Sequence, residues 1–187
     1  MRFVVRSVSF CRLIELSDCL MLGRPRGRGL LIIDMQEEFV ARLSPGERDG
    51  LSGNQYEAIS VARENGVHMY IAQLGTDSPV VGEIHRWTRG DAITYYRFHP
   101  DALTNQVLLQ TLHEDDIGTL VLTGVSADHQ VLCTAESARR HRIRVASALS
   151  LLANLPEYGR VEEGKFVRAF GENILGYRDV LDLLRKP

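Results

Sequence analysis

The stretch that decides the fold is LLIIDMQ at residues 30–36, where four aliphatic residues run into an acid without alternation. A continuous apolar run of this length predicts a β-strand that is buried on both faces, as in a parallel sheet. Asp34 then stands at the carboxyl end of the strand, where open α/β sheets bind ligands. A carboxylate is costly to bury unless it is paired or used. We therefore take Asp34 as the candidate working residue; the alternative is that it only caps the following turn.

Segments typical of strands and helices alternate along the rest of the chain. Strands are predicted at residues 30–33, 67–73, 92–96, 118–124 and 143–149, with a short last strand at residues 167–170. Helices are predicted at residues 55–65, 104–112, 128–140 and 175–184. In the second helix we expect Thr104 as the cap and Val107, Leu108 and Leu112 on the buried side. The alternation predicts a three-layer α/β/α fold, Rossmann-like in architecture, around a central parallel sheet of five to six strands.

Charge and cysteine content restrict the classes of partner. The formal net charge is −2, from 22 basic and 24 acidic residues, which gives no electrostatic reason to expect nucleic acid or a membrane surface as a partner. No apolar run approaches the roughly 18–20 residues of a membrane-spanning helix. The three cysteines, Cys11, Cys19 and Cys133, form neither a disulfide framework nor a CxxC metal motif, which suits a reducing cytoplasm. We expect a cytoplasmic protein.

The chain divides into an extension and one domain. Residues 1–28 form an N-terminal extension with no regular pattern, although residues 1–10 contain strand formers. A targeting peptide, a disordered extension and a start codon assigned too far upstream all fit this segment. Residues 29–187 have the length and pattern of a single domain.

Two phrases carry a resemblance to a known family. They are IDMQ at residues 33–36 with Phe39 close behind, and LTGV at residues 122–125 followed by Thr134 and Ala135. In this order and on these elements they resemble the isochorismatase-like hydrolase superfamily, which also includes nicotinamidases and related amidohydrolases. The resemblance runs from about residue 29 to residue 149, with a weaker tail to residue 184. It implies the fold already predicted and the function of a small-molecule hydrolase.

The amidase branch of this superfamily uses an Asp, a Lys and a Cys nucleophile. The resemblance puts these positions on Asp34, Arg97 and Gln130, so two of the three depart from the amidase pattern. A Gln amide cannot supply the thiolate that an acyl-enzyme requires. A guanidinium keeps its protons at neutral pH and cannot shuttle one as a tuned Lys can. Cys133 stands one turn beyond Gln130, and we expect it to be a small buried core residue instead of a substitute nucleophile.

The isochorismatase branch, which cleaves a vinyl ether, fits these departures better. There the Asp acts as a general acid and no Cys is needed. AQLG at residues 72–75 is similar to that branch's Ala-Gln-Pro-Gly phrase, which implies that Gln73 positions substrate. The resemblance also implies substrate contacts from Phe39, a non-proline cis peptide near Val125 and Ser126, and an oxyanion site at the backbone N–H groups that follow.

No metal or other cofactor is expected, because the Asp/His cluster that binds zinc or iron in nicotinamidases is not visible after Gln73. The partners expected are a small-molecule substrate and other copies of the chain, since family members usually form homodimers or larger homo-oligomers. A nucleotide-binding role is set aside because no Gly-rich phosphate loop follows residues 30–33.

The sequence therefore favours a metal-free, Asp-dependent hydrolase, with Arg97 either pairing with Asp34 or gripping a substrate carboxylate. The alternative is a family member that has lost catalysis and uses the fold for binding or assembly.

Overall fold

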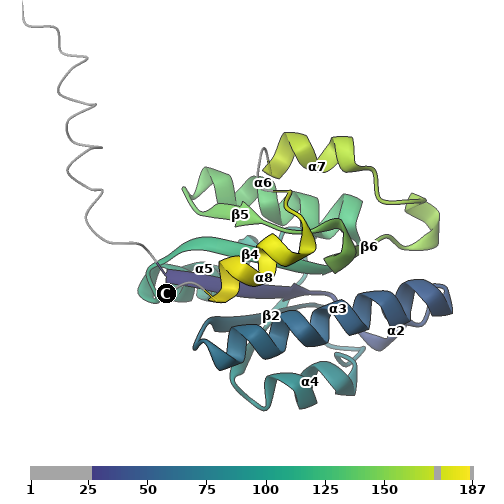
Figure 1. Cartoon of the computed structure of the whole chain (residues 1–187), viewed down its shortest axis with the longest axis horizontal. Helices are drawn as coiled ribbons and strands as arrows, with labels where there is room; N and C mark the ends of the chain where they lie inside the picture. The colour runs from purple at the N-terminus through teal and green to yellow at the C-terminus, as the bar shows by residue number, and fades with distance from the viewer. Residues whose placement is uncertain (1–26, 171–173, 186–187) are drawn as a thin grey trace, which may run out of the picture.

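The computed structural model describes residues 27–170 and 174–185 (Figure 1). Its centre is a six-stranded sheet in the order β3-β2-β1-β4-β5, with β6 paired to β4, and each of these pairings is parallel. The strands are β1 (Gly27–Ile33), β2 (His68–Leu74), β3 (Ala92–Arg97), β4 (Ile117–Val125), β5 (Arg144–Ala146) and β6 (Leu152–Ala153). The predicted parallel α/β/α fold is confirmed. Most of the N-terminal extension, including the strand formers at residues 1–10, lies outside the described residues.

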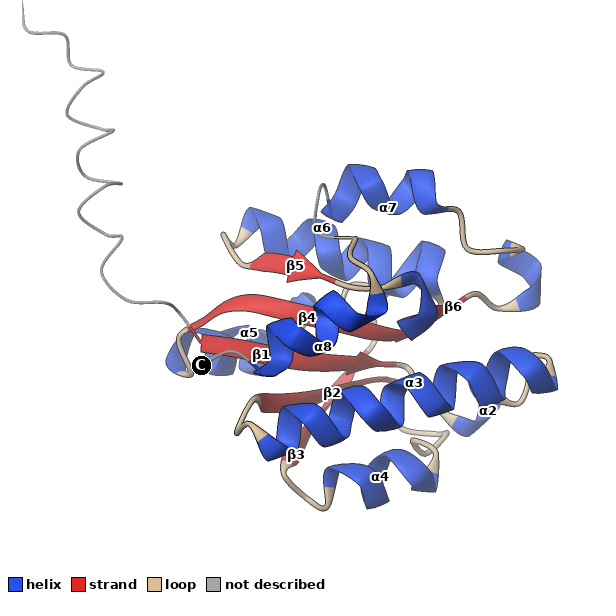
Figure 2. Cartoon of the chain, viewed as in Figure 1, coloured by secondary structure: helices blue, strands red, loops and turns tan. Residues whose placement is uncertain are grey.

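Helices cover both faces of the sheet (Figure 2). They are α2 (Glu37–Val40), α3 (Pro45–Glu64), α4 (Gly82–Thr88), α5 (Gln106–Glu114), α6 (Leu132–Arg140), α7 (Glu163–Phe170) and α8 (Tyr177–Arg185). Buried side chains of α3, α4 and α8 belong to one hydrophobic cluster, and those of α5, α6 and α7 belong to a second. The sheet therefore separates two cores, one on each face.

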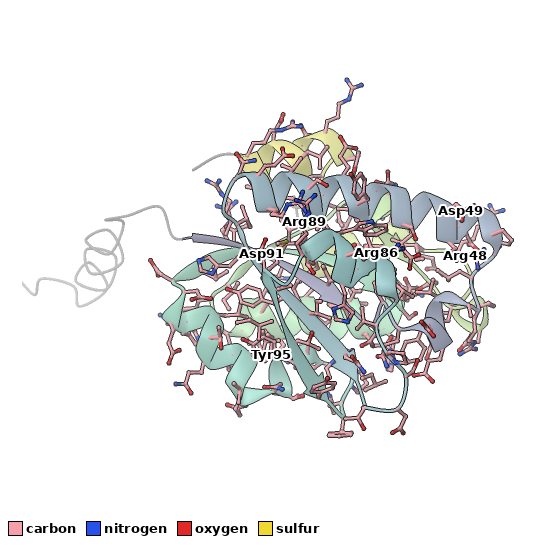
Figure 3. All side chains as sticks on the ribbon, turned by 90° about the horizontal axis from the view of Figure 1, so that it is seen from below. Arg48, Asp49, Arg86, Arg89, Asp91 and Tyr95 are labelled. Atoms are coloured by element: carbon pink, nitrogen blue, oxygen red, sulfur yellow. The ribbon has the colours of Figure 1, made fainter. Side chains whose placement is uncertain are left out.

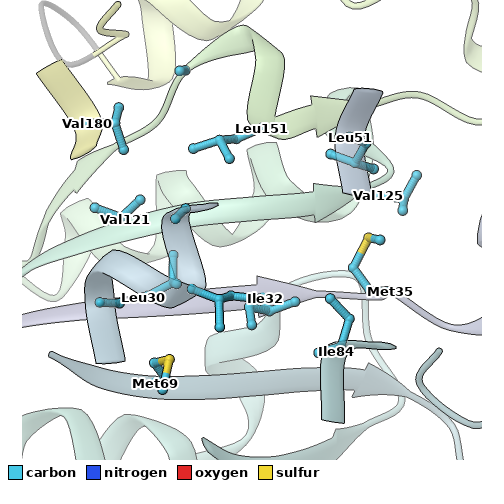
Figure 4. Packing of buried hydrophobic residues seen from close by; sticks show 14 of the residues in the cluster. Leu30, Ile32, Met35, Leu51, Met69, Ile84, Val121, Val125, Leu151 and Val180 are labelled. Atoms are coloured by element: carbon cyan, nitrogen blue, oxygen red, sulfur yellow. The ribbon is translucent and has the colours of Figure 1, made fainter. Parts of the chain in front are cut away.

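The opening strand β1 contributes to both cores, as its unbroken apolar sequence predicts. Leu30 and Ile32 point into the first cluster, and Leu31 and Ile33 point into the second, because successive side chains of a strand face opposite sides. All four are completely buried. Figure 4 shows Leu30 and Ile32 among the side chains of the first cluster.

Helix α3 begins well before the predicted start at residue 55. Ser44 caps it through a capping box with Glu47, and Pro45 occupies the first turn. This start signal, a Ser followed three residues later by Glu with a Pro between them, is legible in the sequence. The helix predicted at residues 55–65 begins too late, because Ser, Pro and Gly standing together are also typical of a loop. Helix α4 was not predicted at all.

The predicted strand at residues 167–170 is wrong, because this segment ends helix α7. Phe166 and Phe170 stand one helical turn apart, and both are buried in the second cluster. A short apolar run does not distinguish a buried strand from a buried helix by its period. The strand predicted at residues 143–149 is also shorter than expected, since β5 ends at Ala146.

Helix α5 is displaced from its predicted position. Its cap is Asn105, whose side chain accepts a hydrogen bond from the Leu108 backbone N–H at 3.0 Å, and not Thr104. Leu108 and Leu112 are buried as predicted, but Val107 is 65% exposed and Leu109 takes its place on the inner side.

Charged residues lie on the outer surfaces of the helices. Figure 3 shows Arg48 and Asp49 on α3 and Arg86 on α4. Arg48 is 3.8 Å from Asp49, and Arg86 is 2.8 Å from Glu83. No helix within the described residues is both long enough and apolar enough to span a membrane.

Candidate functional site

The centre of the candidate site is an ion pair between the ends of two strands. Asp34 follows β1 with a positive φ of 49°, and its backbone N–H donates to the Ala72 carbonyl at 2.9 Å. Arg97 is the last residue of β3, two strands away across the sheet. Its Nη2 lies 2.5 Å from Asp34 Oδ2, and both side chains are buried. The structure therefore brings together two candidate residues that are 63 positions apart in the sequence.

Asp34 and Arg97 are joined by a single hydrogen bond, although a carboxylate and a guanidinium can form two. Asp34 Oδ1 and Arg97 Nε are both buried with no hydrogen-bond partner among the described residues. Arg97 Nη1 donates to the His99 carbonyl. The guanidinium is thus anchored to the chain on one side and to the carboxylate on the other, so it is a fixed charge beside Asp34.

Burial and the neighbouring cation act on the Asp34 proton in opposite directions. Burial penalises the charged carboxylate and is the larger effect, so the pKa of Asp34 is raised to about 6 although Arg97 acts to lower it. Burial also lowers the pKa of Arg97, and the Asp34 carboxylate opposes that shift. A carboxyl with this pKa exchanges its proton near neutral pH, as a general acid or base must.

Two glutamines secure the loop that follows β2. The side chain of Gln36 donates to the carbonyls of Leu74 and Ser78 at 3.0 and 2.8 Å, and it accepts from the Leu74 N–H at 2.8 Å. Gln73, the predicted substrate contact, donates to the same Ser78 carbonyl at 2.8 Å. Gln73 therefore lies at the candidate site, but its amide nitrogen is used to hold the loop after β2. Gln36 was part of the quoted motif, and nothing in the sequence indicates its partners.

The turn after β4 supplies the opposite wall. Gly124 has a φ of 132°, and the peptide bond between Val125 and Ser126 is cis. Gln130 lies in the π-helical turn that follows, and its side-chain oxygen accepts a hydrogen bond from the Ser126 N–H at 3.1 Å. The chain's own glutamine therefore occupies the Ser126 N–H, which directly precedes the N–H groups expected to bind an oxyanion.

Asn154, which sequence reasoning missed, supports this turn from outside. Its Oδ1 accepts from the Asp128 N–H at 2.8 Å and lies 3.1 Å from Ser126 Oγ. Asn154 directly follows β6, a two-residue strand too short to be recognised from the sequence. No sequence signal marked it.

The structure also places Cys133 and Phe39, two residues named in the sequence analysis. Cys133 is partly exposed, so its prediction as a buried core residue is wrong. Burial raises the pKa of its thiol, and the charges of Glu136 and Asp101 act in the same direction. Phe39 is only partly buried and packs against the first cluster.

The donor set does not fit a metal of the nicotinamidase type. Within residues 27–170 and 174–185, no three or more His, Cys, Asp or Glu residues are grouped so that they could hold a metal ion. The side chains described above at the sheet edge include one carboxylate, one guanidinium and amides.

The fold and site define a three-layer α/β protein with a candidate acid–base residue at the carboxyl edge of a parallel sheet. The family model for the isochorismatase domain matches residues 28–148. The chain therefore belongs to the isochorismatase-like hydrolase family. A search of curated proteins found no match.

Solved structures share the fold. An isochorismatase-like hydrolase from Alkaliphilus metalliredigens is 20% identical, with a TM-score of 0.71 over 84% of this chain and 98% of that one. The nicotinamidase of Staphylococcus aureus is 19% identical, with a TM-score of 0.63 over 72% and 87% of the two chains. The YcaC gene product of Escherichia coli, an octameric hydrolase of unknown specificity, is 16% identical, with a TM-score of 0.68 over 84% and 82%.

Proposed function

We propose that this chain is a hydrolase of a small metabolite that depends on Asp34 and uses neither a thiol nor a metal or other cofactor. The observation that carries the proposal is the buried carboxylate at the end of the central strand, whose pKa of about 6 lets it give and take a proton near neutrality. A structural acid has no need of such a position, because burying it costs free energy. Arg97 fixes the carboxylate in place and is the positioning residue of the pair.

In this proposal the bond that is hydrolysed is the C–O bond of a vinyl ether. Protonated Asp34 donates its proton to the enol-ether carbon, and the resulting oxocarbenium ion is attacked by water. The Asp34 carboxylate then accepts a proton from that water, which restores the starting acid, and the hemiketal collapses to a ketone and an alcohol. No step needs a thiolate, which agrees with Gln130 at the nucleophile position. Substrate contacts are assigned to Gln73, Phe39, Val125 and Ser126.

A second candidate function is binding or assembly without catalysis. Two observations favour this function. The Ser126 N–H already donates a hydrogen bond to Gln130, and the side chains of Gln73 and Gln130 are both buried. In this case the site would be closed by its own side chains. The Asp34–Arg97 pair would then serve only to hold β1 and β3 in register.

We also propose that the protein works as a cytoplasmic homo-oligomer, with a small molecule and no nucleic acid or membrane as its partner. Support comes from the octameric YcaC neighbour and from large apolar side chains left exposed near the edge strand β3. These exposed side chains are Ile93, Tyr96, Phe98 and Val107.

The test is hydrolase turnover on isochorismate, nicotinamide and simple N-carbamoyl compounds, measured for wild type, Asp34→Asn and Cys133→Ser. We expect turnover of the vinyl ether that Asp34→Asn reduces by at least about a hundredfold and Cys133→Ser leaves unchanged. Circular dichroism and thermal unfolding establish that the three proteins are equally folded. Amide turnover lost in Cys133→Ser would contradict the thiol-free assignment. No turnover by a folded wild type on any substrate would favour the binding protein.

A further inference from the structure

The turn after β4 is held on its outer side by the segment that runs from β6 into α7 (Figure 1). Asn154 accepts a hydrogen bond from the Asp128 N–H at 2.8 Å. The ring of Tyr158 stacks on the ring of His129, with the ring centres 5.8 Å apart. Lys165, in the first turn of α7, places its Nζ 2.6 Å from Asp128 Oδ2. Three residues of one segment therefore contact two neighbouring residues of the turn.

The two ends of the ion pair between Asp128 and Lys165 differ in their exposure to solvent. The Lys165 side chain is 35% exposed, whereas the Asp128 side chain is only 4% exposed. Asp128 Oδ1 is also buried, with no hydrogen-bond partner among the described residues. An ion pair exposed at both ends contributes little to stability, but a buried carboxylate that loses its partner is costly. Loss of the ammonium group would therefore leave the Asp128 carboxylate buried without the cation that it pairs with in the structure.

The same turn forms a wall of the candidate site on its inner side. Asp128 lies in the π-helical turn Ala127–Val131, two residues from Ser126 and two residues from Gln130. The Gln130 side chain accepts a hydrogen bond from the Ser126 N–H at 3.1 Å. Single π-helical turns of this kind are frequent at functional sites. Because the three residues share a short stretch of backbone, a movement of Asp128 toward solvent also displaces Ser126 or Gln130.

We propose that Lys165 is a positioning residue of the candidate site. Its ammonium group holds Asp128 in its buried position, and Asp128 keeps the turn in the arrangement in which Gln130 occupies the Ser126 N–H. Without this charge the Asp128 carboxylate moves toward water, and the turn opens at Ser126 and Gln130. The effect on the turn does not require catalysis. The effect on substrate binding rests on the proposed hydrolase function, in which Val125 and Ser126 contact the substrate.

Native-state hydrogen exchange, followed by NMR on the full chain, measures the opening of the turn. In Lys165→Met we expect the protection factors of the Ser126 and Asp128 amides to fall at least about fivefold, because a hydrogen bond between charged groups is lost. Amides of helix α4, which packs in the other core, should keep their protection. Lys165→Arg keeps the charge and should keep most of the protection. Glu162→Gln is the matched control, because exposed Glu162 is the other partner of Lys165, at 3.5 Å, and its substitution should leave the turn unchanged.

A double variant separates the charge of Lys165 from the packing of its carbon chain. Asp128→Asn removes the carboxylate that Lys165→Met leaves unpaired. The combined variant, Asp128→Asn with Lys165→Met, should therefore regain most of the protection that the Ser126 amide loses in Lys165→Met. The combined variant should also fold if Lys165→Met alone does not, because no unpaired charge remains buried.

Turnover of isochorismate provides a second readout. In Lys165→Met we expect KM to rise at least about threefold and kcat to stay within about twofold of wild type, because a wall that contacts the substrate loosens while the Asp34 carboxyl is untouched. Lys165→Arg should restore KM. A wild type without turnover would contradict the proposed function, and hydrogen exchange would still decide the role of Lys165.

Three results would overturn the proposal. The first is unchanged protection of the Ser126 amide in a folded Lys165→Met protein. The second is an equal loss of protection in Glu162→Gln. The third is a combined variant that exchanges as fast as Lys165→Met or fails to fold, because the lysine would then not act through the Asp128 carboxylate.

Discussion

At the scale of single residues, the candidate site depends on the balance between burial and one neighbouring charge. Asp34 is fully buried, and this raises its pKa more than Arg97 lowers it. The sequence alone does not show which of these two effects is larger. The structure shows that burial is the larger effect, because the Asp34 side chain is completely buried and its ion pair with Arg97 does not offset the cost of desolvation.

The raised pKa of Asp34 predicts a stability change with pH. The folded state holds the proton up to about pH 6, whereas an ordinary Asp loses it near 3.8. The folded state is therefore favoured most below the lower value, and this contribution is lost as pH rises to about 6. We expect this loss to lower the free energy of unfolding by about 2 kcal/mol between pH 4 and pH 7. Urea unfolding at several pH values measures it, and the difference from Asp34→Asn isolates this carboxyl from the others. Identical pH profiles for the two proteins would contradict the shift.

Arg97→Met tests the other half of the ion pair. It removes the charge that favours ionised Asp34, so the pKa of Asp34 should rise further above 6. At pH 8 the variant should lose about 3–5 kcal/mol of unfolding free energy, because a buried charge is left without a partner. The loss should be smaller at pH 5, where the carboxyl is neutral. Carboxyl ¹³C NMR titration measures the pKa directly, with Arg97→Lys as the control that keeps the charge. If the pKa of Asp34 is the same in Arg97→Met as in the wild type, the Arg97 charge does not act on the Asp34 carboxyl.

At the scale of elements, the site depends on how closely β4 approaches β1. Gly124 pairs with Ile33 across the two strands. A Cβ at Gly124 would lie 1.9 Å from the Ile33 carbonyl oxygen, and the φ of 132° is unfavourable for any other residue. The close approach places the turn with Ser126 and Gln130 beside the end of β1. The packing of β4 against β1 therefore requires the glycine of the LTGV phrase, whether or not the site is catalytic.

Gly124→Ala should prevent folding or lower the free energy of unfolding by more than about 4 kcal/mol, because backbone atoms must move to admit the methyl group. The control is Gly53→Ala in helix α3, where a Cβ meets open space. That change should raise stability by about 1 kcal/mol through helix propensity. Chemical unfolding followed by circular dichroism measures both. A Gly124→Ala protein as stable as the wild type would mean that the strands can separate at little cost.

At the scale of the whole molecule, the exposed surface near β3 differs from the rest. β3 lies at one edge of the sheet, and Phe98, just beyond its end, is 82% exposed. Exposed apolar side chains at a strand edge that no other described strand covers are typical of an interface. Because Arg97 ends this strand, a second copy docked here would lie close to the candidate site.

We expect the protein to self-associate and Phe98→Asp to reduce its molecular mass in solution. The control is Val167→Asp, which places the same charge on an exposed apolar position of α7, on the far side of the molecule (Figure 2). Size-exclusion chromatography with light scattering gives the mass of each protein. A monomeric wild type, or an equal effect of the two substitutions, would rule out this edge as the interface.

The sequence by itself determined the central strand of the sheet and the position of Asp34 at its carboxyl end. The apolar run at residues 30–33 requires cover on both faces, and Asp34 follows it directly, so a buried strand with an acid at its carboxyl end is legible from local pattern alone. Local pattern was insufficient at residues 167–170, where four residues fit a strand or a helix and only packing against the second cluster selected α7.

Only the tertiary structure decided the partners of the polar groups. The Asp34–Arg97 contact, the Gln36 bonds to the loop after β2, and the bonds of Asn154 to the turn after β4 join residues 26 to 63 positions apart. The sequence pattern of one segment contains no information on which distant donor meets which acceptor. The balance that sets the Asp34 pKa depends on burial and on one interatomic distance, and both exist only once the chain is folded.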